Sequence, residues 1–454
     1  MARVSTHGAR QNKKPFPFLR LPHPVLVRVF SYKGVLPVQN LTICKALLPA
    51  TLDALFAFAR LVTPTQLRMF CLALARQPAF LRSVRGLRIG SAGKVYAGKG
   101  EENWDEAGEG SEGLARLFGD CESGQGDTLP VNSGLVKALV SRLPLLTDLK
   151  LSTVSLVAIF FDVDFLKHGP LPLPALRVLR LKICTHEGLN MPQAASLLHN
   201  LSEYLPSLHT LYLSRTIYSM PLDLLNLSPA SRLPPRSWPL ETFALCLVTL
   251  KPEIRNAFSA FSSLTRLVLR ILERPYAKLM DDLARLPPTL RELVLNWGVS
   301  CPGKHQPDSL PRFGGSVQPY FPHLQQLLLA GDIVDASTFA LLHTFPSLAS
   351  LTLGVHTQII ADRLLALVDD VEALPLLDEL VVDICACPPP SLKFPSSRQP
   401  LKRRPIWPRE FGYSEAKRLI EAADEAGVEL SGTVLCAARS CDKADGHDCP
   451  RWYR

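Results

Sequence analysis

Short motifs that mark catalytic and membrane-spanning chains are missing from this sequence of 454 residues. It has no G-x-S-x-G, no H-E-x-x-H and no C-x-x-C, and no carboxylate pair stands at a spacing suited to general acid–base chemistry. No apolar run approaches the roughly 18 residues of a membrane-spanning helix, and the opening MARVSTHGARQNKKPFPF lacks the apolar core of a secretory signal. We therefore expect no enzyme activity, no catalytic, metal-binding or cofactor-binding residues, and no membrane partner.

The cysteine spacing indicates the cellular compartment, and the net charge indicates the kind of partner. The 11 cysteines are an odd number without paired spacing, which favours free thiols in a reducing cytoplasmic or nuclear compartment. The formal net charge of +9 favours acidic partners, but it is too small to indicate nucleic-acid binding by itself. We expect a protein partner and no nucleic acid.

A nine-residue pattern recurs along the chain. It reads FPSLASLTL from Phe345, FPHLQQLLL from Phe321, LPSLHTLYL from Leu205, LPALRVLRL from Leu173 and LPLLTDLKL from Leu143. The Leu-x-Leu alternation predicts a short strand with one buried face, because successive strand residues point to opposite sides. Apolar residues at helical spacing precede several copies, and the proline ends the helix before the strand. Degenerate copies begin their apolar triplets at Val84, Leu240, Leu264, Leu290 and Leu377.

One such unit of helix, turn and strand cannot stand alone. Three buried leucines stabilise it by roughly 1.5–3 kcal/mol each, whereas ordering its backbone costs about 1–2 kcal/mol per residue. Stacking the units against one another offsets this free-energy cost. The pattern resembles the leucine-rich repeat, L-x-x-L-x-L-x-x-N/C-x-L. The expected fold is therefore α/β, a leucine-rich-repeat solenoid with a curved parallel strand ribbon and outer helices. A stack of ordinary amphipathic helices is the alternative, and the regular Pro-Leu punctuation argues against it.

The residues between the inward leucines are predicted to face the open, concave side of the ribbon. They are mainly basic in the earlier copies and acidic or neutral in the later ones, so a partner with a matching charge distribution would be oriented by this face. The predicted substrate-binding residues are Arg88, Lys150, Arg180, Lys182, Tyr212, Arg266, Arg270, Glu292, Asn296, Glu379 and Asp383.

Residues 21 to 89 precede the main array and are punctuated by prolines into short helices. LPHPVLVRVFSY followed by LTICKAL resembles an F-box, and TPTQLRMFCLALARQPAFLRSVRGLRI is similar to the joining segment of F-box/leucine-rich-repeat proteins abundant in mushroom-forming fungi. In that family the F-box docks on the adaptor subunit of a cullin-type ubiquitin ligase, and the repeats hold the substrate. The resemblance implies that the docking residues are Leu21, Pro22, Leu26, Val29, Phe30, Leu41, Ile43, Cys44 and Lys45.

The predicted organisation has four parts. A basic disordered tail (1–20) precedes the small all-helical F-box-like module and its connecting helices (21–83). The solenoid (84–435) carries a mobile acidic insertion (90–128) and a Pro-rich basic loop (387–409), and a flexible tail (436–454) follows. The resemblance implies a substrate-recognition adaptor of a cullin-type ubiquitin ligase that binds the ligase adaptor subunit and a protein substrate. The alternative is a non-ligase repeat scaffold in which the helical module only caps the first repeat.

Overall fold

The structure is a computed structural model of the whole chain, which forms two compact units, residues 1–150 and 151–454. The residues it describes are 22, 48–61, 64–90, 131–151, 173–183, 201–202, 205–215, 238–247, 258, 261–271, 279–297, 313, 320–331, 333–334, 336–354, 361–370, 372, 374–383 and 413–435.

The first unit contains helices and short parallel strands. Its elements are α2 (Leu48–Ala57), β1 (Phe58–Leu61), α3 (Pro64–Arg76), the 3-10 helix η3 (Pro78–Arg82), β2 (Gly86–Ile89), α5 (Val131–Ser141) and β3 (Asp148–Leu151), of which the last residue belongs to the second unit. β1 pairs in parallel with β2, and Phe58 lies opposite Gly86.

Strand β1 was not anticipated, because the sequence predicted short helices throughout this stretch. The reason is visible in its burial: Phe58 and Arg60 are exposed, whereas Ala59 and Leu61 are buried. That alternation is the period of a strand with one covered face. The four residues are too few for the pattern to stand out from the flanking helices.

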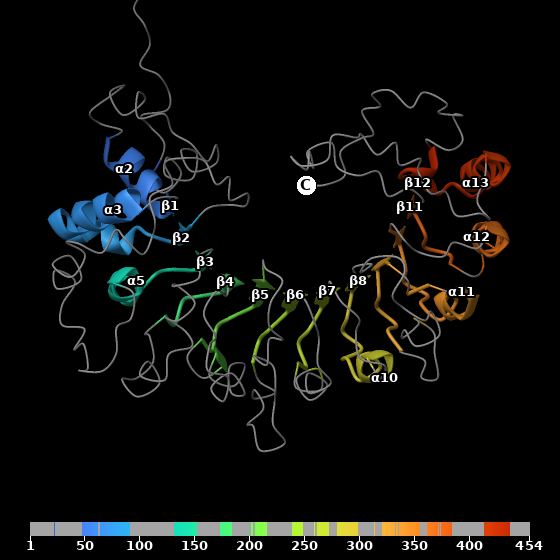
Figure 1. Cartoon of the computed structure of the whole chain (residues 1–454), viewed down its shortest axis with the longest axis horizontal. Helices are drawn as coiled ribbons and strands as arrows, with labels where there is room; N and C mark the ends of the chain where they lie inside the picture. Colours follow the sequence, from blue (N-terminus) through green and yellow to red (C-terminus); the bar gives the residue numbers. More distant parts are fainter. Residues whose placement is uncertain are drawn as a thin grey trace, which may run out of the picture. The chain divides into compact units, whose positions relative to one another are not determined.

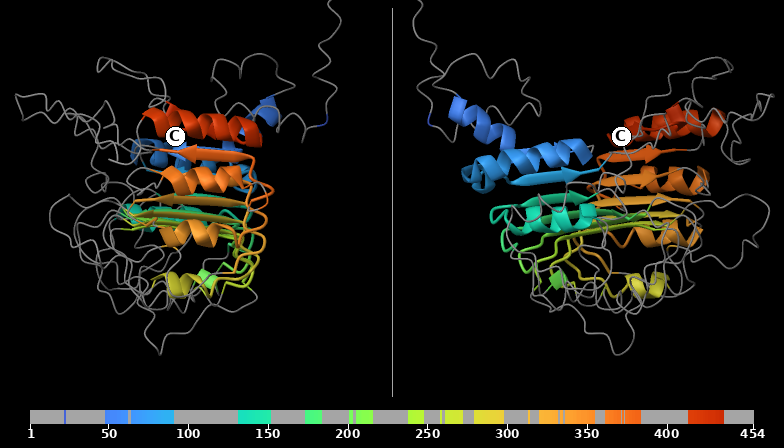
Figure 2. Two further views of the ribbon diagram at one scale, coloured as in Figure 1. Left: turned by 90° about the vertical axis from the view of Figure 1, so that its right-hand side faces the viewer. Right: turned by 60° about the vertical axis from the view of Figure 1, so that its left-hand side comes forward.

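The second unit is a ribbon of parallel strands with helices on one side (Figures 1 and 2). Its strands are β4 (Val178–Ile183), β5 (Thr210–Arg215), β6 (Thr242–Leu247), β7 (Arg266–Ile271), β8 (Glu292–Trp297), β9 (Gln326–Ala330), β10 (Ser350–Leu353), β11 (Glu379–Val382) and β12 (Glu429–Ser431). Its helices are α10 (Leu279–Leu283), α11 (Ala336–Leu342), α12 (Ala361–Asp369) and α13 (Tyr413–Ala426). From β4 to β12 each strand pairs in parallel with the next one in the chain. The predicted α/β solenoid is confirmed at this level.

In the second unit, β4, β5 and β7 to β11 are each introduced by a hydrogen-bonded turn. The amide of Leu208 donates to the carbonyl of Leu205 at 3.1 Å, and the amide of Leu348 donates to that of Phe345 at the same distance. The proline between them occupies the first corner of the turn, where its fixed φ is favourable. The Pro-Leu punctuation therefore marks turns, as the sequence indicated.

The leucines of the pattern form the core. In β7 and β8 the inward residues Leu267, Leu269, Leu293 and Leu295 are all 0% exposed. They stack from strand to strand, since Leu267 lies opposite Leu293 and Leu269 lies opposite Leu295. The helices close the other side of this core, and in α12 the residues that cover it are Ala361, Leu364, Leu365, Leu367 and Val368.

Glycines at the ends of strands permit close contact between successive strands. Gly331 follows β9 with φ +93°, and a Cβ there would overlap the backbone carbonyl of Trp297 on β8. Gly427 follows α13 with φ +73°, but a Cβ there would meet nothing within 4 Å. A comparison of substitutions at the two positions therefore separates the cost of backbone strain from the cost of steric overlap.

We predict that Gly331→Ala destabilises the second unit more than Gly427→Ala. Both changes carry the strain of a left-handed residue, about 1–2 kcal/mol, whereas only Gly331→Ala adds the overlap with Trp297, roughly 1–3 kcal/mol more. Urea unfolding followed by circular dichroism measures the difference. Equal losses in the two variants would show that β9 can move away from β8 without cost.

Candidate functional site: the concave face of the second unit

The concave face is the side of the β4–β12 ribbon away from α10–α13 (Figure 1). Its side chains stand in three rows that cross the strands, because parallel pairing sets equivalent residues side by side. The first row is Val178, Thr210, Thr242, Arg266, Glu292, Gln326, Ser350, Glu379 and Glu429. The middle row is Arg180, Tyr212, Ala244, Val268, Val294, Leu328, Thr352, Val381 and Ser431. The third row includes Ser214, Cys246, Arg270, Asn296 and Ala330.

The centre of the middle row is apolar, which the sequence analysis missed. Ala244, Val268 and Val294 form one cluster, and the half-buried Tyr212 and Leu328 pack against its two ends. Strict alternation from Arg266 and Arg270 would have placed Val268 on this face, but only the polar neighbours were assigned to it. The face therefore has an apolar floor between two polar rims.

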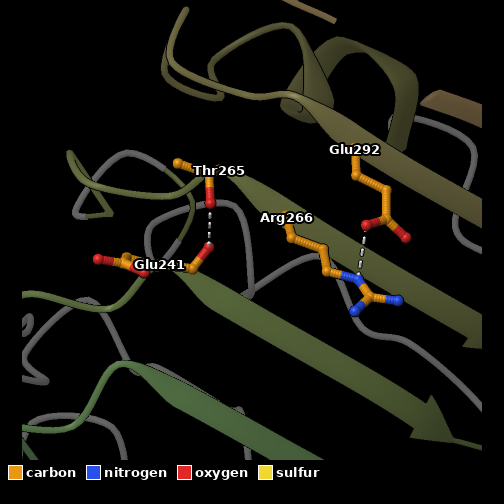
Figure 3. Close-up of polar contacts among 4 residues, drawn as sticks. All are labelled: Glu241, Thr265, Arg266 and Glu292. Carbon is orange, nitrogen blue, oxygen red and sulfur yellow. Dashed lines mark hydrogen bonds and ion pairs between the residues drawn. The ribbon is translucent and has the colours of Figure 1, made fainter. Parts of the chain in front are cut away.

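An ion pair spans the first row between β7 and β8 (Figure 3). Arg266 Nε lies 2.9 Å from Glu292 Oε2, and the two side chains are 50% and 23% exposed. Such an exposed pair contributes at most about 0.2–1 kcal/mol to stability. Its larger effect is on the local charge, since Glu292 neutralises Arg266.

A shallow depression of about 90 Å³ opens beside this pair, between β8 and β10. It is lined by Glu292, Val294, Gln326, Leu327, Leu328, Ser350 and Thr352. Pockets for cofactors and drug-sized ligands usually measure ~300–1,000 Å³, so this depression suits a side chain of a partner.

The third row carries a charge without a carboxylate beside it. Arg270 is exposed on β7, opposite Cys246 on β6. Burial raises the pKa of Tyr212, the nearby Cys246 thiol adds to the rise, and the guanidinium groups of Arg270 and Arg180 oppose it. Burial also raises the pKa of Cys246, again against Arg270. At neutral pH the phenol and the thiol are both protonated, so neither neutralises the two arginines.

The structure places the predicted face residues in both units. Arg88 on β2 and Lys150 on β3 belong to the first unit, whereas Arg180 and the later ones belong to the second. The side chain of Lys182 lies outside the described part. Asn296 and Asp383 are half-buried, and the exposed Glu379 accepts a hydrogen bond of 2.7 Å from Ser350 Oγ.

The predicted docking residues of the F-box-like segment are almost all outside the described residues. Pro22 alone among them is described, and it is exposed. The acidic insertion 90–128, apart from Gly90, also lies outside the described ranges, as do the basic loop 387–409 and both tails.

Within the described ranges no group of three or more His, Cys, Asp or Glu side chains could hold a metal ion. The same segments contain no helix that is both long and apolar enough to cross a bilayer. The concave face offers groups for non-covalent recognition: an apolar floor, three arginines of which Arg266 is paired with Glu292, and hydroxyl groups.

No protein-family model matches this sequence, and no curated protein matches it either.

We predict that Cys71 resists alkylation in the native protein. It is fully buried on α3, and burial raises its pKa to about 12, so at pH 8 the thiolate is roughly one part in 10⁴. Iodoacetamide followed by mass spectrometry should find Cys71 unmodified, and modified once the chain is unfolded in denaturant. The half-buried Cys246 is the internal comparison; reaction of Cys71 as fast as Cys246 would contradict the packing of α3.

Proposed function

We propose that the chain is the substrate-recognition subunit of a cullin-type ubiquitin ligase, holding a protein substrate on the concave face of its second unit. The observation that carries the binding role is the apolar floor from Tyr212 to Leu328, framed by charged side chains on a face that no described helix covers. Interfaces with an apolar centre and a polar rim are typical of protein–protein recognition.

The concave face supports a protein partner over a small ligand. The depression at the Leu328 end of the apolar floor holds about 90 Å³, whereas the floor itself runs across β5 to β9. A ligand that used the whole floor would have to extend over five strands. A segment of another protein has that reach.

Attachment to a ligase is supported by the sequence of residues 21–47. LPHPVLVRVFSY and LTICKAL carry the apolar spacing of an F-box. Two departures from the usual pattern are Pro24 at an acidic position and Lys33 after Tyr32. If they abolish docking, the chain is a binding scaffold whose helical segment caps the first repeat, which is the second candidate.

Co-purification of the full-length chain with the ligase adaptor subunit tests the proposal. We expect a complex with the unmodified chain and none with Leu26→Asp/Phe30→Asp, because charges at these two positions would break an apolar docking surface. The control is Leu55→Asp, since Leu55 is an apolar side chain of the first unit that is 41% exposed and lies outside the F-box pattern.

Circular dichroism must show that the variants keep their fold. No complex with the unmodified chain would refute ligase attachment and leave the binding scaffold. A complex that survives Leu26→Asp/Phe30→Asp would refute docking through this segment.

A further inference from the structure

Four side chains at the β4–β7 end of the concave face indicate the chemistry of a partner. Arg180 lies beside Tyr212 in the middle row, and Arg270 lies beside Cys246 in the third row. Tyr212 and Cys246 are on neighbouring strands, two residues apart in register, so they join the two pairs diagonally. The result is two guanidinium groups on either side of a protonated phenol.

These two arginines differ from the third arginine of the face. Arg266 is paired with Glu292 at 2.9 Å. For Arg180 and Arg270 the described part of the chain provides no acidic partner, and the residues beside Arg270 in its row are Cys246 and Asn296. Guanidinium groups form their strongest hydrogen bonds with carboxylates and other oxyanions. This end of the face therefore favours an acidic group.

The apolar floor indicates the length and the apolar character of the partner segment that carries this acidic group. From Tyr212 on β5 the floor continues through Ala244, Val268 and Val294 to Leu328 on β9. Four strand spacings of about 4.8 Å give a length of roughly 19 Å. An extended segment of about six residues or a helix of about thirteen covers this length.

The other end of the face has the opposite charge. Beyond the depression beside Leu328, the charged side chains described on the face are acidic, with Glu379 on β11 and Glu429 on β12 both exposed. A partner with its acidic end over β4–β7 and a basic or neutral end over β11–β12 is therefore favoured over the reverse orientation.

We infer, on the basis of the partner-binding role proposed above, that the concave face of the second unit takes an acidic, apolar protein segment. An Asp or Glu carboxylate of the partner lies between Arg180 and Arg270, and the Tyr212 hydroxyl is a further hydrogen-bond donor to it. Adjacent apolar side chains of the partner lie along the floor towards Leu328.

The probe is a phage-displayed library of random, unphosphorylated peptides of 16 residues, selected on the immobilised full chain. Clones that also bind Leu328→Asp are removed, so that the remaining peptides depend on the concave face. Dissociation constants of the corresponding synthetic peptides are then measured by fluorescence anisotropy for the unmodified chain, Arg180→Glu/Arg270→Glu, Arg270→Glu and Arg363→Glu.

The expected result is a set of peptides with Asp or Glu next to apolar residues. Arg180→Glu/Arg270→Glu should weaken them by roughly tenfold or more, since like charges then face each other. Replacing the acidic residue of the peptide by Lys should restore binding to that variant. Arg363→Glu, an equal charge change at an exposed position on the outer helix α12, should alter binding by no more than about twofold.

The single variant Arg270→Glu is the control for misfolding of the double variant, because Arg270 is exposed whereas Arg180 is half-buried. All variants must keep the circular dichroism spectrum and urea midpoint of the unmodified chain. Peptides that need Leu328 but bind Arg270→Glu and the double variant normally would overturn the acidic segment and leave the concave face as a binding surface. If no peptide is sensitive to Leu328→Asp, the concave binding role itself fails, independently of the co-purification result.

Discussion

In every step from β4 to β11, one backbone carbonyl accepts two amides at the start of the next strand. The carbonyl of Glu241 accepts from the amides of Thr265 and Arg266 at 2.8 and 2.9 Å, and Thr265 Oγ1 adds a third bond at 3.2 Å (Figure 3). The carbonyl of Arg291 accepts from the amides of Gln325 and Gln326 at the start of β9 in the same way. These bonds fix the position of each strand from β5 to β11 relative to the preceding one, and the burial of the leucines depends on that position. A slip by one residue would turn Leu267 and Leu269 towards solvent.

The same register determines the chemistry of the concave face. Arg266 meets Glu292, and Arg270 meets Asn296, only because the two strands are paired without offset. Residues from different repeats thus become neighbours although about two dozen positions separate them in the chain. The binding properties of the face are therefore a consequence of the hydrogen bonds along the backbone, and a change in either strand's register would abolish both pairs together.

The sequence predicted the strands of the array well, because Leu-x-Leu after Pro-Leu is a local signal that needs no knowledge of distant residues. It did not predict β1, where four residues between helices gave too little periodicity. It identified Arg266 and Glu292 as face residues but not their ion pair, since a cross-strand contact depends on register. The apolar floor was missed for a different reason. Only polar residues were assigned to the face, although alternation also places Val268 and Val294 there, on the opposite side from Leu267 and Leu293.

The location of a charge matters less for recognition than whether the fold has already neutralised it. Arg266 is the most obvious cation of the ribbon, yet a partner carboxylate there would compete with Glu292 at 2.9 Å and would lie close to a like charge. The residues in register with Arg270 on the neighbouring strands, Cys246 and Asn296, carry no carboxylate. The floor beside Arg270 is apolar, so a carboxylate that binds there is partly removed from water and interacts more strongly with the guanidinium group. The face should therefore discriminate between acidic partners through Arg180 and Arg270, while Arg266 sets the position of Glu292 at the edge of the depression.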